Sequence, residues 1–524
     1  MSLRITYTTP HTAAELEAMN TAFDAAVTHH RSRLGIHYPP QDASQRTLHA
    51  HHAFPSVNPA NLDETLHWFD EFPLDELDTI MDQARAAQNH WGALPWQRRV
   101  EYLRRVATGI RDRLMPLAAA VALESGKNRF ESLGDVAEAA DLIDYYADEL
   151  SAADGYYRPL GSLLPGEQTG SWMRPYGVFV VISPFNFPVA LAVGMSSAAL
   201  LGGNTVVFKP SEETPWCGQL IAEVMHASGL PEGVFQICHG RGEVVGRALV
   251  NHPVTAGVAF TGSVTTGREI HRACTSGRWH KPCLMELGGK NGAIIMPSAN
   301  LDEAALGCVK SVFGLSGQKC SALSRIIVHH DIKADFLHKL CSVAQNWLVS
   351  EPTRRTSNLG PVINTAAVQR AELAHALATT NGGSIIYHHS NVDSSLPKGH
   401  YVMPVFAELP VTHELMLQEL FVPFAGIATV HSLDEAITTL NHSDFGLTAG
   451  CFSQDEHDIQ RFLHEAEAGV LYVNRPTGAT TGAWPGVQSF CGWKASGSSG
   501  KGGCGPWYVS QFMREQSHTR MLPV

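Results

Sequence analysis

The stretch VFVVISPFNFPVALAVGMSSAALLGGNTVVFK, residues 178–209, decides the fold of this chain. Its first five residues are apolar and mostly β-branched, which is typical of a buried strand. The turn SPFNFP follows, and the small and apolar residues 188–201 predict a helix. A second apolar run at 205–208 predicts the next strand. A strand, a helix and a strand at this spacing indicate two parallel neighbours in an α/β sheet.

The same alternation continues along most of the chain. Further short apolar runs predict strands at 233–237, 257–260, 293–295, 325–328, 422–427 and 470–473. Helical patterns separate the earlier ones, at 215–228, 242–250 and 265–274. We expect two doubly wound α/β domains with parallel sheets, joined near residue 284.

The segments before residue 178 have a different character. The stretch 37–62 is rich in His and Pro and predicts an irregular lead-in. Gly and Tyr punctuate residues 153–175, which indicates a two-stranded excursion from the core. Amphipathic patterns around these stretches predict helices at 14–31, 75–93, 96–125 and 133–150.

Composition limits the class of protein. The 524 residues carry a net charge of −12, which argues against a nucleic-acid partner and against an anionic membrane surface. The most apolar long run, 188–203, is too short and too mixed to span a bilayer. Ten dispersed cysteines without a C-x-x-C pair indicate a reducing compartment, so we expect a cytoplasmic protein. The 27 histidines include no H-E-x-x-H pattern, and we expect no metal site.

Two segments carry residues suited to covalent catalysis. Cys320 lies in GQKCSALSR, residues 317–325, and Glu286 lies in MELGGK, residues 285–290. A thiolate attacks carbonyl carbon, and a nearby carboxylate can activate water against the resulting thioester. A single Cys is more often a buried small residue, and a single Glu is more often a surface charge. The surrounding motifs therefore decide between these interpretations.

Turns after the predicted strands supply further candidates at the edge where doubly wound sheets bind ligands. Asn186 could donate its amide to an oxyanion, although a helix cap is the more common role at this spacing. Lys209 and Glu212 follow the next strand and suit the two hydroxyls of an adenine ribose, or alternatively cap a helix. Gly262 and Ser263 precede a helix whose N–H groups suit a pyrophosphate.

Six motifs in this order resemble those of the aldehyde dehydrogenase superfamily, from about residue 75 to the end of the chain. They are PFNFP (184–188), FKPSEETP (208–215), FTGS (260–263), ELGGKN (286–291), GQKCSA (317–322) and QELFVP (418–423). The resemblance implies the fold already expected. It also implies an NAD-dependent oxidation of a small aldehyde to a carboxylic acid.

The resemblance assigns roles to individual residues. It implies that Cys320 is the nucleophile, that Asn186 and the Cys320 main-chain N–H hold the oxyanion, and that Glu286 activates water. An unperturbed thiol is only about 3% ionised at pH 7, so a depressed pKa near the cofactor charge is expected at Cys320. The residues that the resemblance assigns to NAD are Lys209, Glu212, Gly262, Ser263, Glu419 and Phe421.

The closer resemblance is to the branch that oxidises glutamate semialdehyde, the 1-pyrroline-5-carboxylate dehydrogenases of proline catabolism. Ser321 and the loop residues Gly478 and Ala479 match the positions with which that branch anchors the substrate carboxylate. Glu138 falls where the family lines its substrate tunnel and would meet the substrate's amino group. The alternative for Glu138 is a place on a helix surface.

Departures from this branch keep other functions open. Cys491 stands where the branch has glycine, and Ser489 replaces a common proline. We therefore weigh a dehydrogenase of another small polar or carboxylated aldehyde, such as succinate semialdehyde, beside the leading interpretation. A catalytically idle scaffold and an esterase-like or thioester-forming enzyme are less compatible with an intact Cys320 and Glu286.

Domain boundaries and assembly also follow from the resemblance. We expect a cofactor domain of residues 1–152 and 172–283, and a catalytic domain of residues 284–475. Residues 153–171 and 500–524 are expected to form an oligomerisation arm. The family builds dimers through such an arm and often pairs those dimers, so a homodimer or a larger homo-oligomer is expected.

Overall fold

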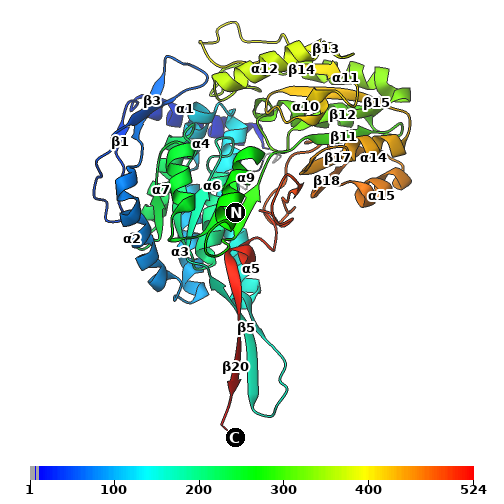
Figure 1. Cartoon of the computed structure of the whole chain (residues 1–524). Coiled ribbons are helices and arrows are strands. Elements are labelled where there is room, and N and C mark those ends of the chain that lie inside the picture. The colour runs from blue at the N-terminus through cyan, green and yellow to red at the C-terminus, as the bar shows by residue number, and fades with distance from the viewer. Residues whose placement is uncertain (1–5, 7–10, 524) are drawn as a thin grey trace.

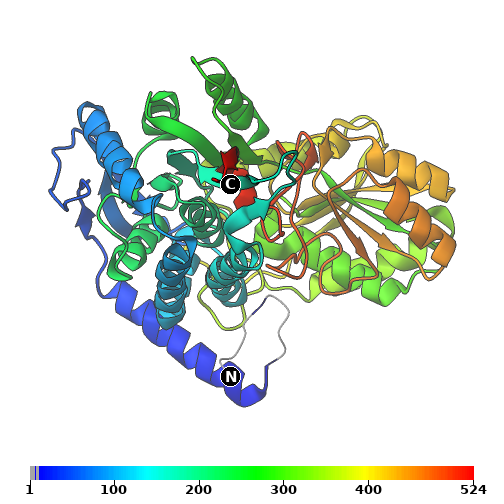
Figure 2. The ribbon, with the colours of Figure 1, turned by 90° about the horizontal axis from the view of Figure 1, so that it is seen from below.

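The computed structural model describes residue 6 and residues 11–523 of the chain. Two α/β lobes lie side by side, and a narrow β-arm projects below the first of them (Figure 1). In the view from below, the helices of the N-terminal half lie on one side and the second sheet with its helices lies on the other (Figure 2). This architecture confirms the prediction of two α/β domains with a small arm.

The first lobe is built on a five-stranded parallel sheet in the order β10-β9-β6-β7-β8. Every residue of β6 and β7 is buried, as expected for strands covered on both faces. The sheet ends at Glu286 rather than at the predicted boundary of 283. Its strands are β6 (Val178–Ile182), β7 (Thr205–Lys209), β8 (Phe235–Ile237), β9 (Thr255–Thr261) and β10 (Cys283–Glu286).

Helices cover both faces of this sheet because alternate strand residues point to opposite sides. One face packs on α3 (Trp96–Asp112), α5 (Arg129–Ala152), α6 (Ala190–Leu201) and α7 (Pro215–Ala227). The other packs on α2 (Leu77–Trp91), α8 (Arg247–Asn251) and α9 (Val264–Thr275). A further helix, α4 (Leu114–Ser125), is separated from α3 by Arg113, so the predicted helical stretch 96–125 is two abutting helices.

The second lobe has a seven-stranded sheet in the order β13-β14-β15-β12-β11-β17-β18. The edge strand β13 runs antiparallel to β14, so the prediction of a purely parallel sheet is wrong at this edge. The strands are β11 (Asn291–Ile295), β12 (Leu323–His329), β13 (Ser384–His388), β14 (Val405–Glu408), β15 (Phe424–Val430), β17 (Thr448–Phe452) and β18 (Val470–Val473).

Five main helices cover the second sheet. One face packs on α10 (Leu301–Phe313) and α11 (Lys333–Gln345). The other face packs on α12 (Thr365–Leu377), α14 (Leu433–Asn441) and α15 (Glu456–Glu465). Short elements connect them: α13 (Glu414–Leu417) and the pair β16 (Phe445–Gly446) and β19 (Trp493–Lys494).

The N-terminal segment is more ordered than the sequence indicated. After α1 (Ala13–Arg31), a small sheet forms from β1 (His37–Tyr38), β2 (Ala53–Val57) and β3 (Thr65–Asp70). Leu66 and Phe69 of β3 pack on Trp216 at the start of α7. This buried apolar face stabilises the strands, so the prediction of an irregular lead-in at 37–62 is wrong for its strand residues.

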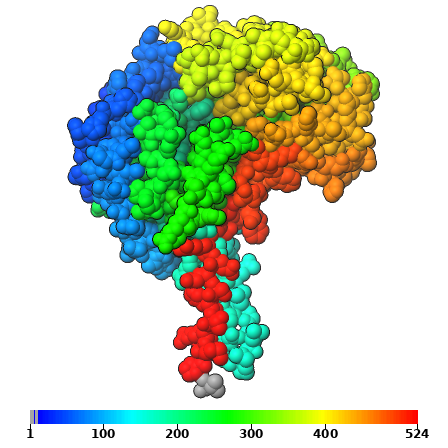
Figure 3. Space-filling view, viewed as in Figure 1, coloured from blue at the N-terminus to red at the C-terminus, as the bar shows by residue number. Residues whose placement is uncertain are grey.

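The arm is a three-stranded antiparallel sheet in the order β20-β5-β4. Its strands are β4 (Tyr157–Pro159), β5 (Glu167–Pro175) and β20 (Met513–Met521), and it projects well clear of the body (Figure 3). The prediction also assigned residues 500–512 to the arm, and this is wrong. Cys504, Tyr508 and Phe512 are buried in the core of the first lobe because their apolar side chains pack among its helices.

Candidate active site

Two cavities meet at Cys320. The first, the strand-end cavity, has a volume of about 890 Å³ and lies at the carboxyl ends of β6, β7 and β9. The second, the loop cavity, has a volume of about 570 Å³ and lies between α5, α6, α10 and segments of the chain beyond residue 476. Cys320 and Thr261 line both cavities. A ligand in either cavity can therefore reach the thiol.

A tight loop presents Cys320 at this junction. After α10, the 3-10 turn η4 (Gly314–Gly317) holds Leu315 and Ser316 in the left-handed backbone region, at φ of 48° and 51°. Such conformations cost free energy and persist only where the surroundings fix them. Asn291 fixes this loop, because its Nδ2 donates to the carbonyl oxygen of Cys320 at 2.7 Å.

Asn186 holds the same loop at a second point. Its Nδ2 donates to the carbonyl oxygen of Gln318 at 2.9 Å, and its side chain is buried. The helix α6 begins only at Ala190, and its N-cap residue Val189 makes no side-chain capping bond. The helix-cap interpretation of Asn186 is therefore wrong. The amide lies beside the loop that carries the thiol.

Glu286 ends β10 and lines the loop cavity. The main-chain N–H of Gly503 donates to its Oε1 at 2.8 Å. Burial raises the pKa of Glu286 to about 7, and the hydrogen bond from Gly503 offsets only part of this effect. A carboxyl group with a pKa near 7 can take up and release a proton at neutral pH, which suits a general base.

The thiol of Cys320 has a raised pKa. Burial is the largest cause, the carboxylates of Glu286 and Glu419 add to it, and the N–H groups of Ser321 and Cys320 oppose it. The result is a pKa of about 12. The expectation of a depressed pKa near the cofactor charge stays a prediction, because it concerns the enzyme with its cofactor bound. Two carboxylates raise the pKa of the thiol, one from each cavity.

Lys209 and Glu212 form an ion pair in the strand-end cavity, with Nζ and Oε2 3.2 Å apart. Lys209 is buried and also donates to the carbonyl oxygen of Pro210 at 2.7 Å, whereas the Glu212 side chain is 42% exposed. Neither residue caps α7, whose N-cap is Thr214. A Cβ at Gly246 would lie 3.3 Å from Cδ of Lys209, so glycine leaves room for a ligand beside the lysine.

The start of α9 borders the same cavity. Ser263 is the N-cap of this helix, and its hydroxyl accepts a hydrogen bond from the N–H of Thr266 at 3.2 Å. Gly262, Ser263 and Thr266 all line the cavity. The positive end of the helix dipole therefore adjoins a space that can accept an anionic group.

Glu419 and Phe421 complete the strand-end cavity. Oε1 of Glu419 accepts the N–H of Gly289 at 2.8 Å, and a Cβ at Gly288 would lie only 2.3 Å from Oε2. A larger residue at Gly288 would therefore displace the Glu419 carboxylate from its present position. Phe421 adopts a left-handed backbone, with φ of 58°, and packs edge-on against Phe185.

The structure brings Ser321 and Glu138 to the wall of the loop cavity. Ser321 follows Cys320 and is almost completely buried. Glu138 lies on α5, where its Oε1 is 4.0 Å from the Sγ of Cys504. The alternative that Glu138 lies on an exposed helix surface is wrong.

Gly478 and Ala479 do not line the loop cavity, so their predicted role as the carboxylate anchor is wrong. Their main-chain N–H groups donate to the carbonyl oxygens of Arg475 and Gly307, and Ala479 is buried in the core of the second lobe. The tripeptide Thr-Gly-Ala occurs twice in this loop, at 477–479 and at 481–483. The second copy lines the cavity, together with Thr477.

Arg475 fixes the second copy of the tripeptide. Its guanidinium donates to the carbonyl oxygens of Thr481 and Gly482 at 2.6 and 2.9 Å. Gly482 has φ of 108°, a conformation that other residues rarely adopt, and a Cβ there would lie 2.6 Å from the guanidinium nitrogens. The repeat of the tripeptide was the available signal in the sequence, but only the packing shows which copy faces the cavity.

Comparison with known proteins places this geometry in a family. The model of the aldehyde dehydrogenase family matches residues 47–518. The chain belongs to the aldehyde dehydrogenase family. It is 33% identical over 519 residues to a protein of Geobacillus thermodenitrificans named 1-pyrroline-5-carboxylate dehydrogenase, covering 98% of both chains.

Solved structures of aldehyde dehydrogenases show the same fold. A 1-pyrroline-5-carboxylate dehydrogenase from Thermus with bound NAD superimposes with a TM-score of 0.91, at 31% identity over the full length of both chains. Lactaldehyde dehydrogenase from Escherichia coli gives a TM-score of 0.86 at 30% identity, over 93% of this chain and all of that one.

This aldehyde dehydrogenase also uses a buried ion pair that the sequence analysis missed. Nζ of Lys127 and Oδ2 of Asp135 are 2.9 Å apart, and both side chains are fully buried. Asp135 also accepts the N–H of Ala190 at 2.8 Å, and the Lys127 ammonium lies 3.7 Å above the ring of Phe187. The pair therefore fixes the turn that carries Asn186. Periodicity gives no signal for such a contact.

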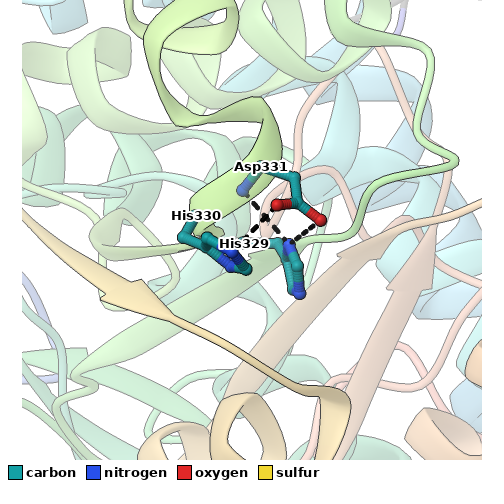
Figure 4. A group of neighbouring side chains, drawn as sticks. All are labelled: His329, His330 and Asp331. Atoms are coloured by element: carbon teal, nitrogen blue, oxygen red, sulfur yellow. Dashed lines mark hydrogen bonds and ion pairs between the residues drawn. The ribbon is translucent and has the colours of Figure 1, made fainter.

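Possible metal ligands gather at one place within the described residues, at His329, His330 and Asp331 (Figure 4). Nδ1 of His329 accepts the N–H of Asp331, and its Nε2 bonds the carbonyl oxygen of His431. Asp331 also pairs with His330 at 2.8 Å. These bonds explain the cluster as a turn at the end of β12, outside both cavities of the aldehyde dehydrogenase.

Proposed function

We propose that this enzyme oxidises glutamate semialdehyde, the open form of 1-pyrroline-5-carboxylate, to glutamate with NAD, in proline catabolism. One observation carries the proposal. Cys320 lies where the strand-end cavity, whose donors suit a dinucleotide, meets the loop cavity, which holds the half-buried carboxyl of Glu286. The names of the relatives support the choice of aldehyde.

Cys320 acts as the nucleophile in this proposal. The thiol first releases its proton to solvent. The thiolate sulfur then bonds the carbonyl carbon, and the electron pair of the C=O double bond moves to the oxygen, which takes the negative charge. The amide of Asn186 has two N–H donors, of which one is bonded to Gln318, so the second can serve the oxyanion with the main-chain N–H of Cys320. A donor placed in this way stabilises the transition state by about 3 kcal/mol.

Glu286 acts as the base in the second half of the reaction. Loss of hydride from the carbon leaves a thioester on Cys320, and water must then attack it to release the acid. Glu286 lines the loop cavity beside Cys320, and its raised pKa allows it to accept the proton of that water. The thiol leaves with a proton, which restores the enzyme.

The strand-end cavity fits NAD, which when bound supplies the acceptor for the hydride. Lys209 and Glu212 would hold the adenine ribose, and the exposed carboxylate of Glu212 disfavours a 2′-phosphate by charge. Gly262 and Ser263 at the start of α9 would meet the pyrophosphate. Glu419 would hold the nicotinamide ribose with Phe421 beside it, since only its Oε1 is bonded to the N–H of Gly289.

The loop cavity would hold the rest of the substrate. We assign the carboxylate to the hydroxyl of Ser321 and the main chain of Gly482 and Ala483, in place of Gly478 and Ala479. Glu138 would meet the amino group. A glutamate semialdehyde molecule offers both groups at the end opposite its aldehyde, so the aldehyde is directed toward Cys320.

The arm is proposed to join two copies of the chain. Leu160, Leu163 and Leu164 at its tip are 51%, 94% and 59% exposed, which is unusual for leucines this close together. A second copy would cover them, giving a homodimer or a larger homo-oligomer. No helix among the described residues is long and apolar enough to cross a membrane. The ten free thiols support the proposal of a cytoplasmic enzyme.

The test is NADH formation with pyrroline-5-carboxylate beside a panel of other aldehydes, for the wild type and Cys320→Ala. Fast turnover on pyrroline-5-carboxylate that the substitution abolishes would support both chemistry and substrate. Faster turnover on succinate semialdehyde or another small polar aldehyde would support the proposed mechanism but contradict the proposed substrate. Undiminished turnover in Cys320→Ala would overturn the proposal.

A further inference from the structure

Lys310 is a charged residue on the wall of the loop cavity that the proposed chemistry does not use. It lies in the last turn of α10, and its side chain is partly buried. Burial lowers the pKa of Lys310, and no carboxylate lies close enough to oppose this effect. A partly buried ammonium group without an anionic partner favours a ligand that brings one.

The other basic residues of this wall are already paired. Nζ of Lys319 lies 2.6 Å from Oε1 of Glu131. Arg355 pairs with Glu17 and Asp24. For Lys310, by contrast, no ion pair or side-chain hydrogen bond is found among residues 11–523. Lys310 therefore provides the positive charge of the cavity that remains available to a substrate.

Helix geometry places Lys310 beside the proposed carboxylate anchor. Gly307, Lys310 and Gly314 follow one another at spacings of three and four, so they share a face of α10. A Cβ at Gly307 would lie 2.7 Å from the Arg475 carbonyl oxygen, and one at Gly314 would lie 2.7 Å from Nζ of Lys319. Lys310 thus lies between the 475–483 loop and the residue before Cys320.

A second contact ties this turn of α10 to the anchor loop. The hydroxyl of Ser311 lies 3.3 Å from that of Thr481, and it also accepts the N–H of Thr480 at 3.2 Å. The backbone of Lys310 is therefore held against the loop that carries Gly482 and Ala483. Movement of the loop away from the lysine would break both contacts.

We propose that Lys310 is a specificity-determining residue, whose ammonium group selects aldehydes that carry a carboxylate by meeting that carboxylate beside Ser321 and the 481–483 loop. The inference rests on the proposed function and deepens it. Main-chain N–H groups recognise the shape of a carboxylate, whereas Lys310 recognises its charge. An aldehyde of the same length without a charge would leave the ammonium group unpaired.

A competing role is purely structural, because a lysine in the last turn of a helix also interacts favourably with the helix dipole. That role does not depend on the charge of the substrate. The test therefore compares kcat/KM for glutamate semialdehyde and for an uncharged aldehyde of similar length. The variants are Lys310→Met, Lys310→Arg and, as a matched control on the neighbouring helix, Lys339→Met, whose partly buried side chain lies outside both cavities and pairs with Asp302.

We expect the ratio of the two kcat/KM values to fall about tenfold in Lys310→Met, mainly through the KM of the charged substrate. Lys310→Arg should retain most of the ratio, and Lys339→Met should leave it unchanged. In the wild type, added salt should lower kcat/KM for the charged substrate alone. A ratio unaltered in Lys310→Met, or a wild type without this salt dependence, would overturn the inference.

Binding of L-glutamate, measured by calorimetry on the full chain, separates this inference from the proposed function. If the wild type turns over no glutamate semialdehyde, the proposed function fails. The role of Lys310 in binding a carboxylate would still be supported if glutamate bound about tenfold more weakly to Lys310→Met and with similar affinity to Lys310→Arg. Equal affinity of the wild type and Lys310→Met for glutamate would sink the inference.

Discussion

The strand-end cavity and the loop cavity share one thiol but are built in different ways. The strand-end cavity takes its functional side chains from the ends of β7 and β9 and the start of α9, where the sheet fixes their positions. The loop cavity takes part of its wall from segments 481–483 and 503–504, which lie outside regular helices and strands. Side chains that follow a predicted strand can be identified as candidate ligand contacts in the sequence. Loop residues that reach a cavity only through packing can be identified only in the folded structure.

Removal of the shared thiol should have the largest effect because both halves of the proposed reaction take place on it. Cys320→Ala is expected to lower steady NADH formation more than about 1,000-fold, since no other nucleophile takes its place. Binding of NAD, followed by fluorescence, should persist. The control is Cys341→Ala, a thiol outside both cavities. Turnover in Cys320→Ala comparable to that of the control would break the account.

Glu286→Gln should separate hydride loss, for which the strand-end cavity supplies the acceptor site, from hydrolysis of the thioester, which the loop cavity serves. Because the carboxyl lines only the loop cavity, one burst of NADH should form at the normal rate, and steady turnover should then fall about 100-fold or more. In the wild type the carboxyl is active when deprotonated, so turnover should rise as the pH rises through about 7. Rapid-mixing measurements over about two pH units below and above this pKa check both points.

The variant should lose this pH dependence because glutamine does not titrate. Loss of the burst along with steady turnover would show that Glu286 acts before hydride loss, and would contradict its assignment. The Cys320 thiol should also ionise more readily in this variant, because the carboxylate of Glu286 raises the pKa of the thiol in the wild type. Alkylation of the thiol by iodoacetamide as a function of pH measures this directly.

Asn186→Ala tests the contact between the β6 turn and the nucleophile loop. We expect kcat to fall about 100-fold, with little change in KM, because the amide serves the oxyanion and not the bound aldehyde. Steady-state kinetics give this separation. A rise in KM with kcat preserved would mean that Asn186 binds substrate and has no part in the oxyanion site.

Ser321→Ala should produce a smaller effect that is confined to the loop cavity. The KM for glutamate semialdehyde is expected to rise about tenfold, because the carboxylate loses one hydroxyl donor. Kinetics with an uncharged aldehyde are the control. An equal rise for both aldehydes would place Ser321 outside the carboxylate anchor.

Glu212→Gln should give the smallest effect, in the strand-end cavity. The preference for NAD over NADP is expected to fall about fivefold, because the carboxylate no longer repels a 2′-phosphate. Ratios of kcat/KM for the two cofactors measure the preference. An unchanged ratio would remove Glu212 from the ribose site.

The difference between the cavities also explains what the sequence could predict. The alternation of strands and helices predicted both α/β domains, and the strand-end motifs brought Lys209, Ser263 and Glu419 to one cavity. The antiparallel edge strand β13 and the small N-terminal sheet were missed because their strands alternate exposed and buried residues weakly. Their pairing depends on distant segments that local periodicity does not report.

The errors at the site have physical causes as well. Asn186 fits both a helix cap and an oxyanion donor by spacing, and only the late start of α6 at Ala190 excludes the cap. The loop contains two identical Thr-Gly-Ala tripeptides, which the sequence does not distinguish. The first is held against Gly307, whose carbonyl oxygen accepts the N–H of Ala479. Burial is the largest cause of the raised pKa of Cys320, and the two carboxylates that add to it lie far from Cys320 in sequence.

In the proposed mechanism Cys320 carries the acyl group, and Glu286 activates the water that releases it. The most direct test of this mechanism is intact-mass spectrometry of Glu286→Gln after mixing with NAD and pyrroline-5-carboxylate, followed by mapping of the modified peptide. The account predicts one acyl adduct, located on Cys320 and absent from the wild type at steady state. An unmodified chain after a full burst of NADH, or an adduct on another residue, would contradict it.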